Sequence, residues 1–190
     1  MNIKDVKDCF INAGKDDTKG KKHKGLLITK PNQPLAEEYV FKAKKNIIFC
    51  ELCKNQGFEY KLPEEWFYTL YYCALAILSK FGIESRSQRC TAVFLHYVRE
   101  KRLIEYDSEL IDRITVHKEK EVVSDVDKRE FARYGAMIKI PEIEQDYEKM
   151  MDVCKKAISQ CEGIVFSDKK FIDSEILSEL GIFDSFGINS

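Results

Sequence analysis

Apolar positions recur every three or four residues over much of the chain, which is the period of an amphipathic helix. The first such stretch, residues 35–55, ends before Gly57. A second stretch, residues 63–80, begins with Pro63, ends before Gly82 and is apolar on most of its circumference. A helix of that kind belongs at the centre of a bundle.

The same period continues toward the C-terminus. Ser85 or Ser87 can cap a helix over residues 87–101, since a serine hydroxyl accepts a hydrogen bond from a free backbone amide. Weaker patterns predict helices over the ranges 107–116, 125–134 and, after Pro141, 141–161. No strand alternation or internal repeat is evident. The series predicts an all-α, up-and-down antiparallel helical bundle over residues 35–162, in which neighbours in sequence pack as neighbours.

The two ends of the chain differ from this bundle. Residues 1–34 combine many lysines with glycines and prolines, which predicts a basic, loosely structured arm with a short helix near residues 3–12. The arm is either a solvated tail or a phosphate-contacting segment, and His23 is expected to be solvated. Its candidate nucleic-acid contacts are Lys21, Lys22, His23 and Lys24. Residues 163–190 form an amphipathic tail that is expected to pack on the bundle as a short helix.

Composition adds limits on location and cofactors. The net charge of −1 neither demands nor excludes a nucleic-acid partner. The 7 scattered cysteines are interpreted as reduced thiols of a cytoplasmic protein. The longest apolar run, Trp66 to Leu78, is too short to span a bilayer. Cys50 and Cys53 have a metal-like spacing without a second pair, so no metal or cofactor is expected.

Several segments resemble HEPN-domain proteins. The runs EEYVFKAKKNIIFCELCKNQGF and EEWFYTLYYCALAILSKFGIESRSQRC are similar to the first two core helices of that family. The later segment KREFARYGA resembles the R-x-x-A-x-Y-G segment of the family, and KKHKGL resembles its basic lead-in. The resemblance covers roughly residues 20–162.

The resemblance implies a helical bundle that forms a homodimer. Many members of the family are metal-independent ribonucleases with an R-x4-6-H motif, and others bind nucleotides or partners without catalysis. Many are encoded beside a minimal nucleotidyltransferase as toxin and antitoxin. The implied partners are therefore a second copy of the chain, a nucleotidyltransferase-like antitoxin, and RNA or a nucleotide.

The residues of the family motif can be placed only in part. Arg129 matches the arginine, with Glu130 and Arg133 beside it, but Tyr134 stands where the histidine belongs. A tyrosine side chain has an ordinary pKa of about 10 and is a poor base at neutral pH. The sequence therefore favours a member of a toxin–antitoxin or defence-type system that binds RNA or a nucleotide with doubtful catalysis. A packing or ion-pairing role for these four residues is the alternative.

Two other pairs have a similar spacing. Arg89 and His96 lie seven residues apart and share a helix face, and Arg113 and His117 lie four apart. Either histidine could move protons near neutral pH. Two alternative functions remain, an active metal-independent ribonuclease toxin and a non-catalytic helical adaptor.

Overall fold

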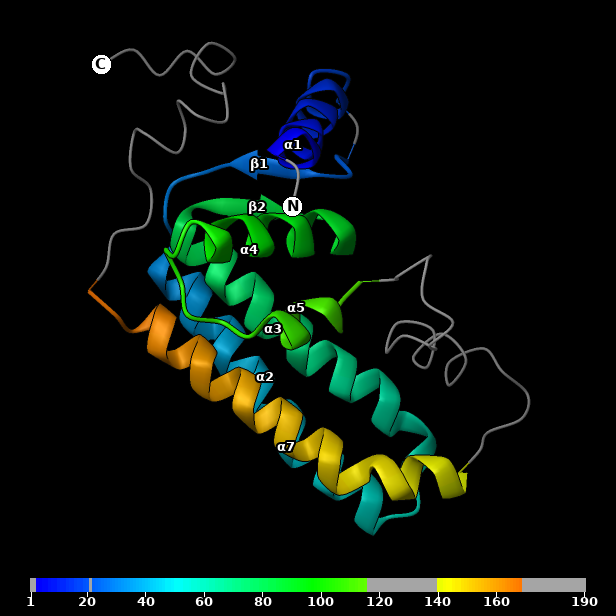
Figure 1. Ribbon diagram of the computed structural model, residues 1–190. Helices are drawn as coiled ribbons and strands as arrows, with labels where there is room; N and C mark the ends of the chain where they lie inside the picture. Colours follow the sequence, from blue (N-terminus) through cyan, green and yellow to red (C-terminus); the bar gives the residue numbers. More distant parts are fainter. Residues whose placement is uncertain (1–2, 21, 116–139, 169–190) are drawn as a thin grey trace.

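The computed structural model of the protein describes residues 3–20, 22–115 and 140–168 (Figure 1). These residues are mostly helical, in agreement with the all-α prediction. The predicted helix over 125–134 and residues 169–190 of the predicted tail lie outside them. The elements in chain order are α1 (Ile3–Asp17), β1 (Leu26–Ile28), α2 (Gln33–Asn55), the 3-10 turn η1 (Glu59–Lys61), α3 (Leu62–Phe81), β2 (Ile83–Ser85), α4 (Gln88–Glu100), α5 (Ser108–Asp112) and α7 (Ile140–Val165).

Three long helices, α2, α3 and α7, pack side by side as the main body of the fold, called here the three-helix part (Figure 1). The middle helix α3 contacts both others, and its Phe67, Leu70 and Ile77 are buried. This confirms that the most apolar stretch of the sequence forms the centre, because only a helix with neighbours on several sides can bury most of its circumference.

The directions of these helices follow from contacts at their ends. At one end, Gln33 Nε2 donates to the Val165 carbonyl at 3.2 Å and Lys80 Nζ donates to the Ser167 carbonyl at 3.0 Å. At the other end, Lys54 Nζ of α2 lies 3.2 Å from Glu148 Oε1, near the start of α7. Helix α2 is therefore antiparallel to α3 and α7, while α3 and α7 run in the same direction.

Helix boundaries agree with local stop and start signals. Helix α3 ends at Gly82, whose φ of 72° is left-handed and where a Cβ would lie 2.7 Å from the Thr29 carbonyl oxygen. The following helix, α4, begins after Ser87, whose hydroxyl accepts from the Cys90 amide at 3.3 Å. The predicted serine cap is thus confirmed at Ser87.

A second layer lies across one end of the three-helix part (Figure 1). This end layer consists of α1, the strand pair β1–β2 and α4. The strands are antiparallel, with Leu26 opposite Ser85 and Ile28 opposite Ile83. The sequence did not indicate them, because three residues are too few for an alternating pattern to be recognised.

The short helix predicted near residues 3–12 is present as α1, but the prediction that residues 1–34 are loosely structured is wrong for their described part. Helix α1 buries Val6, Phe10 and Ala13, and a disulfide joins Cys9 to Cys90 of α4 with a Cα–Cα distance of 5.8 Å. The interpretation of all cysteines as reduced thiols is therefore wrong for this pair. The apolar residues of α1 recur at helical spacing and predicted this helix, whereas the lysines and glycines that follow gave no local sign that it packs on α4.

The structure also bears on the membrane prediction. No helix among residues 3–20, 22–115 and 140–168 is long and apolar enough to cross a membrane. A cytoplasmic location remains a prediction. Oxidising surroundings favour disulfides such as the one between Cys9 and Cys90.

Candidate functional site

The residues that match the HEPN motif are not among those that the structure describes. Arg129, Glu130, Arg133 and Tyr134 all lie in the range 116–139. Their catalytic or binding role remains a prediction from the sequence.

The basic run of the predicted arm is only partly available to a ligand. Lys22 and Lys24 are exposed, whereas Lys21 lies outside the described residues. His23 is 4% exposed, and its Nε2 lies 3.2 Å from Glu84 Oε1. The expectation of a solvated His23 is therefore wrong. The reason is the close approach of Gly25 to α1, where a Cβ would lie 2.2 Å from the Cys9 carbonyl oxygen.

The alternative pair Arg89 and His96 is held by two different elements. The Arg89 guanidinium lies 3.6 Å from Asp5 of α1, and His96 Nε2 lies 3.0 Å from Asp112 Oδ1 of α5. His96 thereby links α4 to α5, whereas the Arg89 side chain stays 73% exposed beside Asp5, and the catalytic role of the pair remains a prediction.

The second alternative pair, Arg113 and His117, is described only in part. Arg113 donates to Glu109 Oε1 at 2.8 Å, whereas His117 lies outside the described residues.

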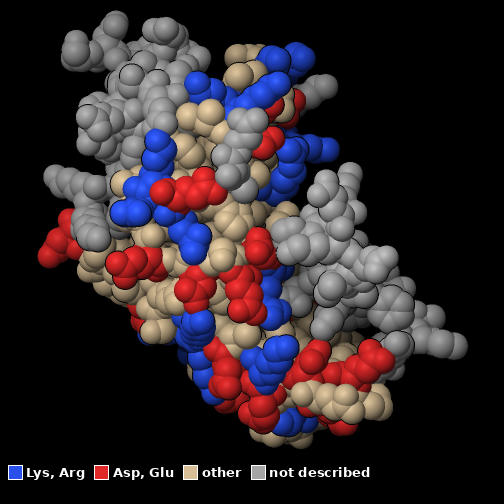
Figure 2. Space-filling view, viewed as in Figure 1, with Lys and Arg blue, Asp and Glu red and all other residues tan. Residues whose placement is uncertain are grey.

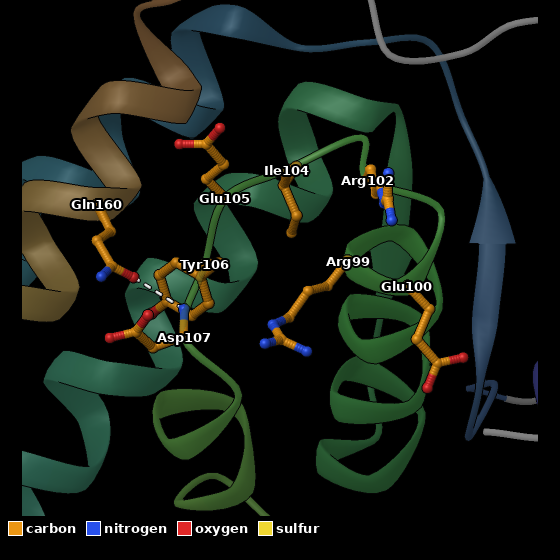
Figure 3. A pocket seen from close by; sticks show the side chains of 8 residues that line it. All are labelled: Arg99, Glu100, Arg102, Ile104, Glu105, Tyr106, Asp107 and Gln160. Atoms are coloured by element: carbon orange, nitrogen blue, oxygen red, sulfur yellow. Dashed lines mark hydrogen bonds between the residues drawn. The ribbon is translucent and has the colours of Figure 1, made fainter.

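A pocket that the sequence did not indicate lies at the C-terminal end of α4 (Figure 3). Its volume is about 600 Å³. The Arg99 side chain extends toward the side where Tyr106 and Asp107 lie, and Glu100 points away from that side (Figure 3). The lining residues are Arg99, Glu100, Arg102, Ile104, Glu105, Tyr106, Asp107 and Gln160.

The far wall of this pocket is fixed by contacts with α7. The Asp107 amide donates to Gln160 Oε1 at 2.9 Å (Figure 3). Hydrogen bonds from Lys156 and then Gln160 hold the pKa of the Asp107 carboxyl below its ordinary value, and Arg99 lowers it further through its charge. Burial raises the pKa of Tyr106 well above its ordinary value, so this wall presents an ionised carboxylate beside a neutral phenol.

Charge is unevenly distributed over the described surface. Residues 86–102 contain one acidic residue, Glu100, and five exposed basic ones, namely Arg86, Arg89, Arg99, Lys101 and Arg102. Helix α7, by contrast, carries more acidic than basic residues. Figure 2 shows blue side chains around α4 with red ones among them, and red and blue side chains mixed over the lower half of the view, where α7 runs. The near-neutral net charge of the chain therefore conceals two groups of exposed basic residues, one at each end of α4, which together are called here the basic surface along α4.

The sequence missed the pocket because its residues come from three separate places: the end of α4, the connection that follows, and α7. The only local signal was the cluster of arginine and lysine residues around residue 100, which is equally typical of a solvated helix end. Within the described residues, no group of three or more His, Cys, Asp or Glu side chains is placed to hold a metal ion.

Comparison with known proteins adds no relative. No protein-family model, curated protein or solved structure matches this chain.

Proposed function

We propose that this protein is a HEPN-type helical bundle that binds RNA or a nucleotide, within a toxin–antitoxin or defence-type system that includes a nucleotidyltransferase-like partner. The mostly helical architecture and the basic surface along α4 support this proposal. Tyr134 in place of the motif histidine favours binding over fast cleavage, because a phenol keeps its proton at neutral pH.

The observation that carries the proposal is the set of exposed arginine and lysine side chains over residues 86–102. The phosphate backbone of a nucleic acid attracts such clusters, and the planar guanidinium of arginine matches two phosphate oxygens at once. Because His23 is turned inward, the expected contact moves from the N-terminal segment to α4.

Binding can be tested by fluorescence anisotropy with a labelled single-stranded RNA at about 50 and 200 mM salt, the range over which phosphate contacts weaken most visibly. We expect the double variant Arg89→Gln, Lys101→Gln to bind more weakly and to lose about 0.7 from the salt slope for each phosphate contact removed. Lys149→Gln removes an exposed charge on α7 and should leave binding unchanged. Absence of binding at the lower salt concentration would contradict the proposal, as would equal affinity of the double variant.

The ribonuclease alternative has its own test. Purified protein is incubated with labelled RNA, with and without a chelator. Cleavage that persists in chelator and disappears in Arg129→Ala would replace the binding proposal by a metal-independent nuclease.

The proposed homodimer is supported by the outer face of α2. The inner face of this helix buries Ala36, Val40 and Ala43, while the opposite face exposes large apolar side chains. Phe41, Ile48 and Leu52 are 59%, 58% and 52% exposed. Phe41 lies about two helical turns before Ile48, and Ile48 lies about one turn before Leu52. Apolar side chains gathered on one face of a helix are typical of an interface.

Sedimentation at several concentrations tests this interface. We expect the wild type to be a dimer and Ile48→Glu to be a monomer, because a charge would be buried at the contact. Ile11→Glu places the same charge on a half-exposed position of α1 and should remain dimeric. A monomeric wild type that also fails to bind RNA would favour the helical adaptor instead, with the outer face of α2 as the surface for another protein.

A further inference from the structure

Arg102 occupies a backbone position that elsewhere in the described chain is taken by glycine. Four described residues have a left-handed φ, namely Gly20 at 64°, Gly57 at 75°, Gly82 at 72° and Arg102 at 58°. The Cβ of an L-residue crowds the backbone in this conformation, so glycine is the usual occupant.

The hydrogen bonds around Arg102 and Gly57 show that both residues end a helix in the same way. After α2, the Phe58 amide donates to the Cys53 carbonyl at 2.8 Å. After α4, the Leu103 amide donates to the Val98 carbonyl at 3.0 Å. Each bond spans five residues, which is the mark of a Schellman cap with its left-handed residue just inside. The backbone at residue 102 therefore favours glycine, and what arginine adds there is its side chain.

That side chain lines the pocket together with Arg99. Arg99 and Arg102 lie three residues apart around the end of α4, and guanidinium groups bind phosphate oxygens. On the other side, the Asp107 carboxylate can accept hydrogen bonds from hydroxyl groups, as carboxylates do from ribose, whereas the Glu105 carboxylate points away from the two arginines (Figure 3). The volume of about 600 Å³ is in the range of small-molecule sites.

From this arrangement we propose that the pocket binds a phosphorylated ribose, with Arg99 and Arg102 on the phosphate and Asp107 on the sugar hydroxyls. The inference rests on the proposed function and names its ligand, which is either a free nucleotide or the phosphorylated end of an RNA. Both carry the same phosphate and ribose groups, so the site does not need a base-specific contact.

Ligand series separate these contributions in the full-length protein. We expect adenosine monophosphate and ribose 5-phosphate to raise the Tm and to bind in calorimetry, and unphosphorylated adenosine to do neither. Short RNAs with a 5′-phosphate or a 5′-hydroxyl then distinguish the two sources: tighter binding of the phosphorylated RNA assigns the site to RNA ends, and equal binding assigns it to free nucleotides. Failure of both small phosphates and of the phosphorylated end to bind preferentially overturns the proposal.

Arg102→Gly is the decisive variant, because its effects on folding and binding should have opposite signs. Glycine adopts the left-handed φ without a Cβ that crowds the backbone, so the Tm of the free protein should rise by about 2–4 °C. Loss of the guanidinium should weaken ribose 5-phosphate about 10- to 100-fold, the usual consequence of removing a charged hydrogen bond. A purely structural role for Arg102 predicts the higher Tm with unchanged binding, which would overturn the proposal.

Two further variants serve as comparison. Arg99→Gln should weaken ribose 5-phosphate to a similar degree without the rise in Tm, and Lys149→Gln should change neither quantity. RNA binding that persists while no phosphorylated ribose binds the pocket overturns this inference alone. Binding of ribose phosphate without any RNA affinity restricts the proposed function to nucleotides and excludes RNA.

Discussion

The three-helix part and the end layer are held together by different means. In the three-helix part, aromatic and aliphatic side chains of α3 are enclosed by α2 and α7, and the free cysteines that the structure describes, Cys50, Cys53, Cys73, Cys154 and Cys161, are all buried there. The end layer adds a covalent link, the Cys9–Cys90 disulfide, beside polar contacts such as that between His23 and Glu84, which have counterparts at the ends of the three-helix part. The basic surface and the start of the pocket lie on α4, in the layer with the disulfide.

The cysteines make this difference chemical as well as structural. Burial raises the pKa of the Cys50 and Cys53 thiols, and a hydrogen bond with Cys161 together with burial raises that of Cys73. Thiols with raised pKa values stay protonated and react slowly. In the end layer, by contrast, Cys9 and Cys90 are oxidised. A disulfide stabilises mainly by constraining the unfolded chain, and this one joins residues 81 apart in sequence.

The largest expected effect comes from the three-helix part. Phe67 is fully buried, and its ring stacks on Tyr71 with a centroid distance of 5.8 Å. Phe67→Ala should lower the free energy of unfolding by about 3–5 kcal/mol, because it removes apolar area and leaves a cavity. Urea unfolding followed by circular dichroism measures this change. Phe166→Ala, at a 56% exposed position, is the matched control and should change the free energy by under about 0.5 kcal/mol.

The next effect should be confined to the end layer. Replacing Cys9 and Cys90 by serine removes a link between residues 81 apart in sequence and should lower the free energy of local opening of the end layer by about 2–4 kcal/mol. Hydrogen exchange should show that amides of α1 lose protection while those of α3 keep it.

Alkylation after mild reduction of the wild type offers a second measurement. Mass spectrometry should find label on Cys9 and Cys90 before it finds label on Cys73, whose thiol is buried and has a raised pKa. In the hydrogen-exchange experiment, equal loss of protection in α1 and α3 of the Cys9→Ser, Cys90→Ser variant would contradict the distinction between the two regions.

The smallest effect concerns acid sensitivity at Glu84. Burial alone would raise the pKa of this carboxyl, but hydrogen bonds with His23 and Arg86 outweigh it and hold the pKa below its ordinary value. A lowered pKa in the folded state contributes stability above the unfolded pKa of about 4.3, and that contribution is lost as the pH falls through the folded pKa. Because the side chain is 42% exposed, we expect less than about 1 kcal/mol.

Thermal unfolding between pH 7 and pH 3 measures this contribution. The Tm of the wild type should fall more than that of Glu84→Gln across this interval. Glu144→Gln, at an exposed position on α7, should behave as the wild type does. An identical acid response of Glu84→Gln and wild type would show that the contact with His23 does not stabilise the end layer.

Local signals predicted the helices of the three-helix part well. Pro63 at the start of α3, Gly82 at its end and Ser87 before α4 stand where the structure places helix boundaries. The apolar faces of α4 and α7 were also predicted, since Val93, Phe94, Met150 and Met151 are buried. These features depend on residues within one or two turns of each other, so the sequence states them directly.

Within the end layer α4 was predicted, but the packing of the N-terminal elements was not, because their order depends on distant partners. Helix α1 is stabilised by α4, whose Cys90 lies 81 residues from Cys9. The strand β1 is defined by its pairing with β2, and His23 is buried by contact with Glu84. A lysine-rich segment next to glycines gives no local sign of such contacts.

The sequence by itself determined the helical class, the central position of residues 63–80 and several helix ends, because periodicity and capping are local properties of the chain. Only the tertiary structure decided that α1 is part of the fold, that α3 and α7 run in the same direction, and that Arg99 and Arg102 line one pocket with Asp107 and Gln160. The left-handed backbone at Arg102 is likewise a product of the way α4 ends against the following connection. Such features depend on contacts between residues far apart in sequence, and these contacts exist only once the chain is packed.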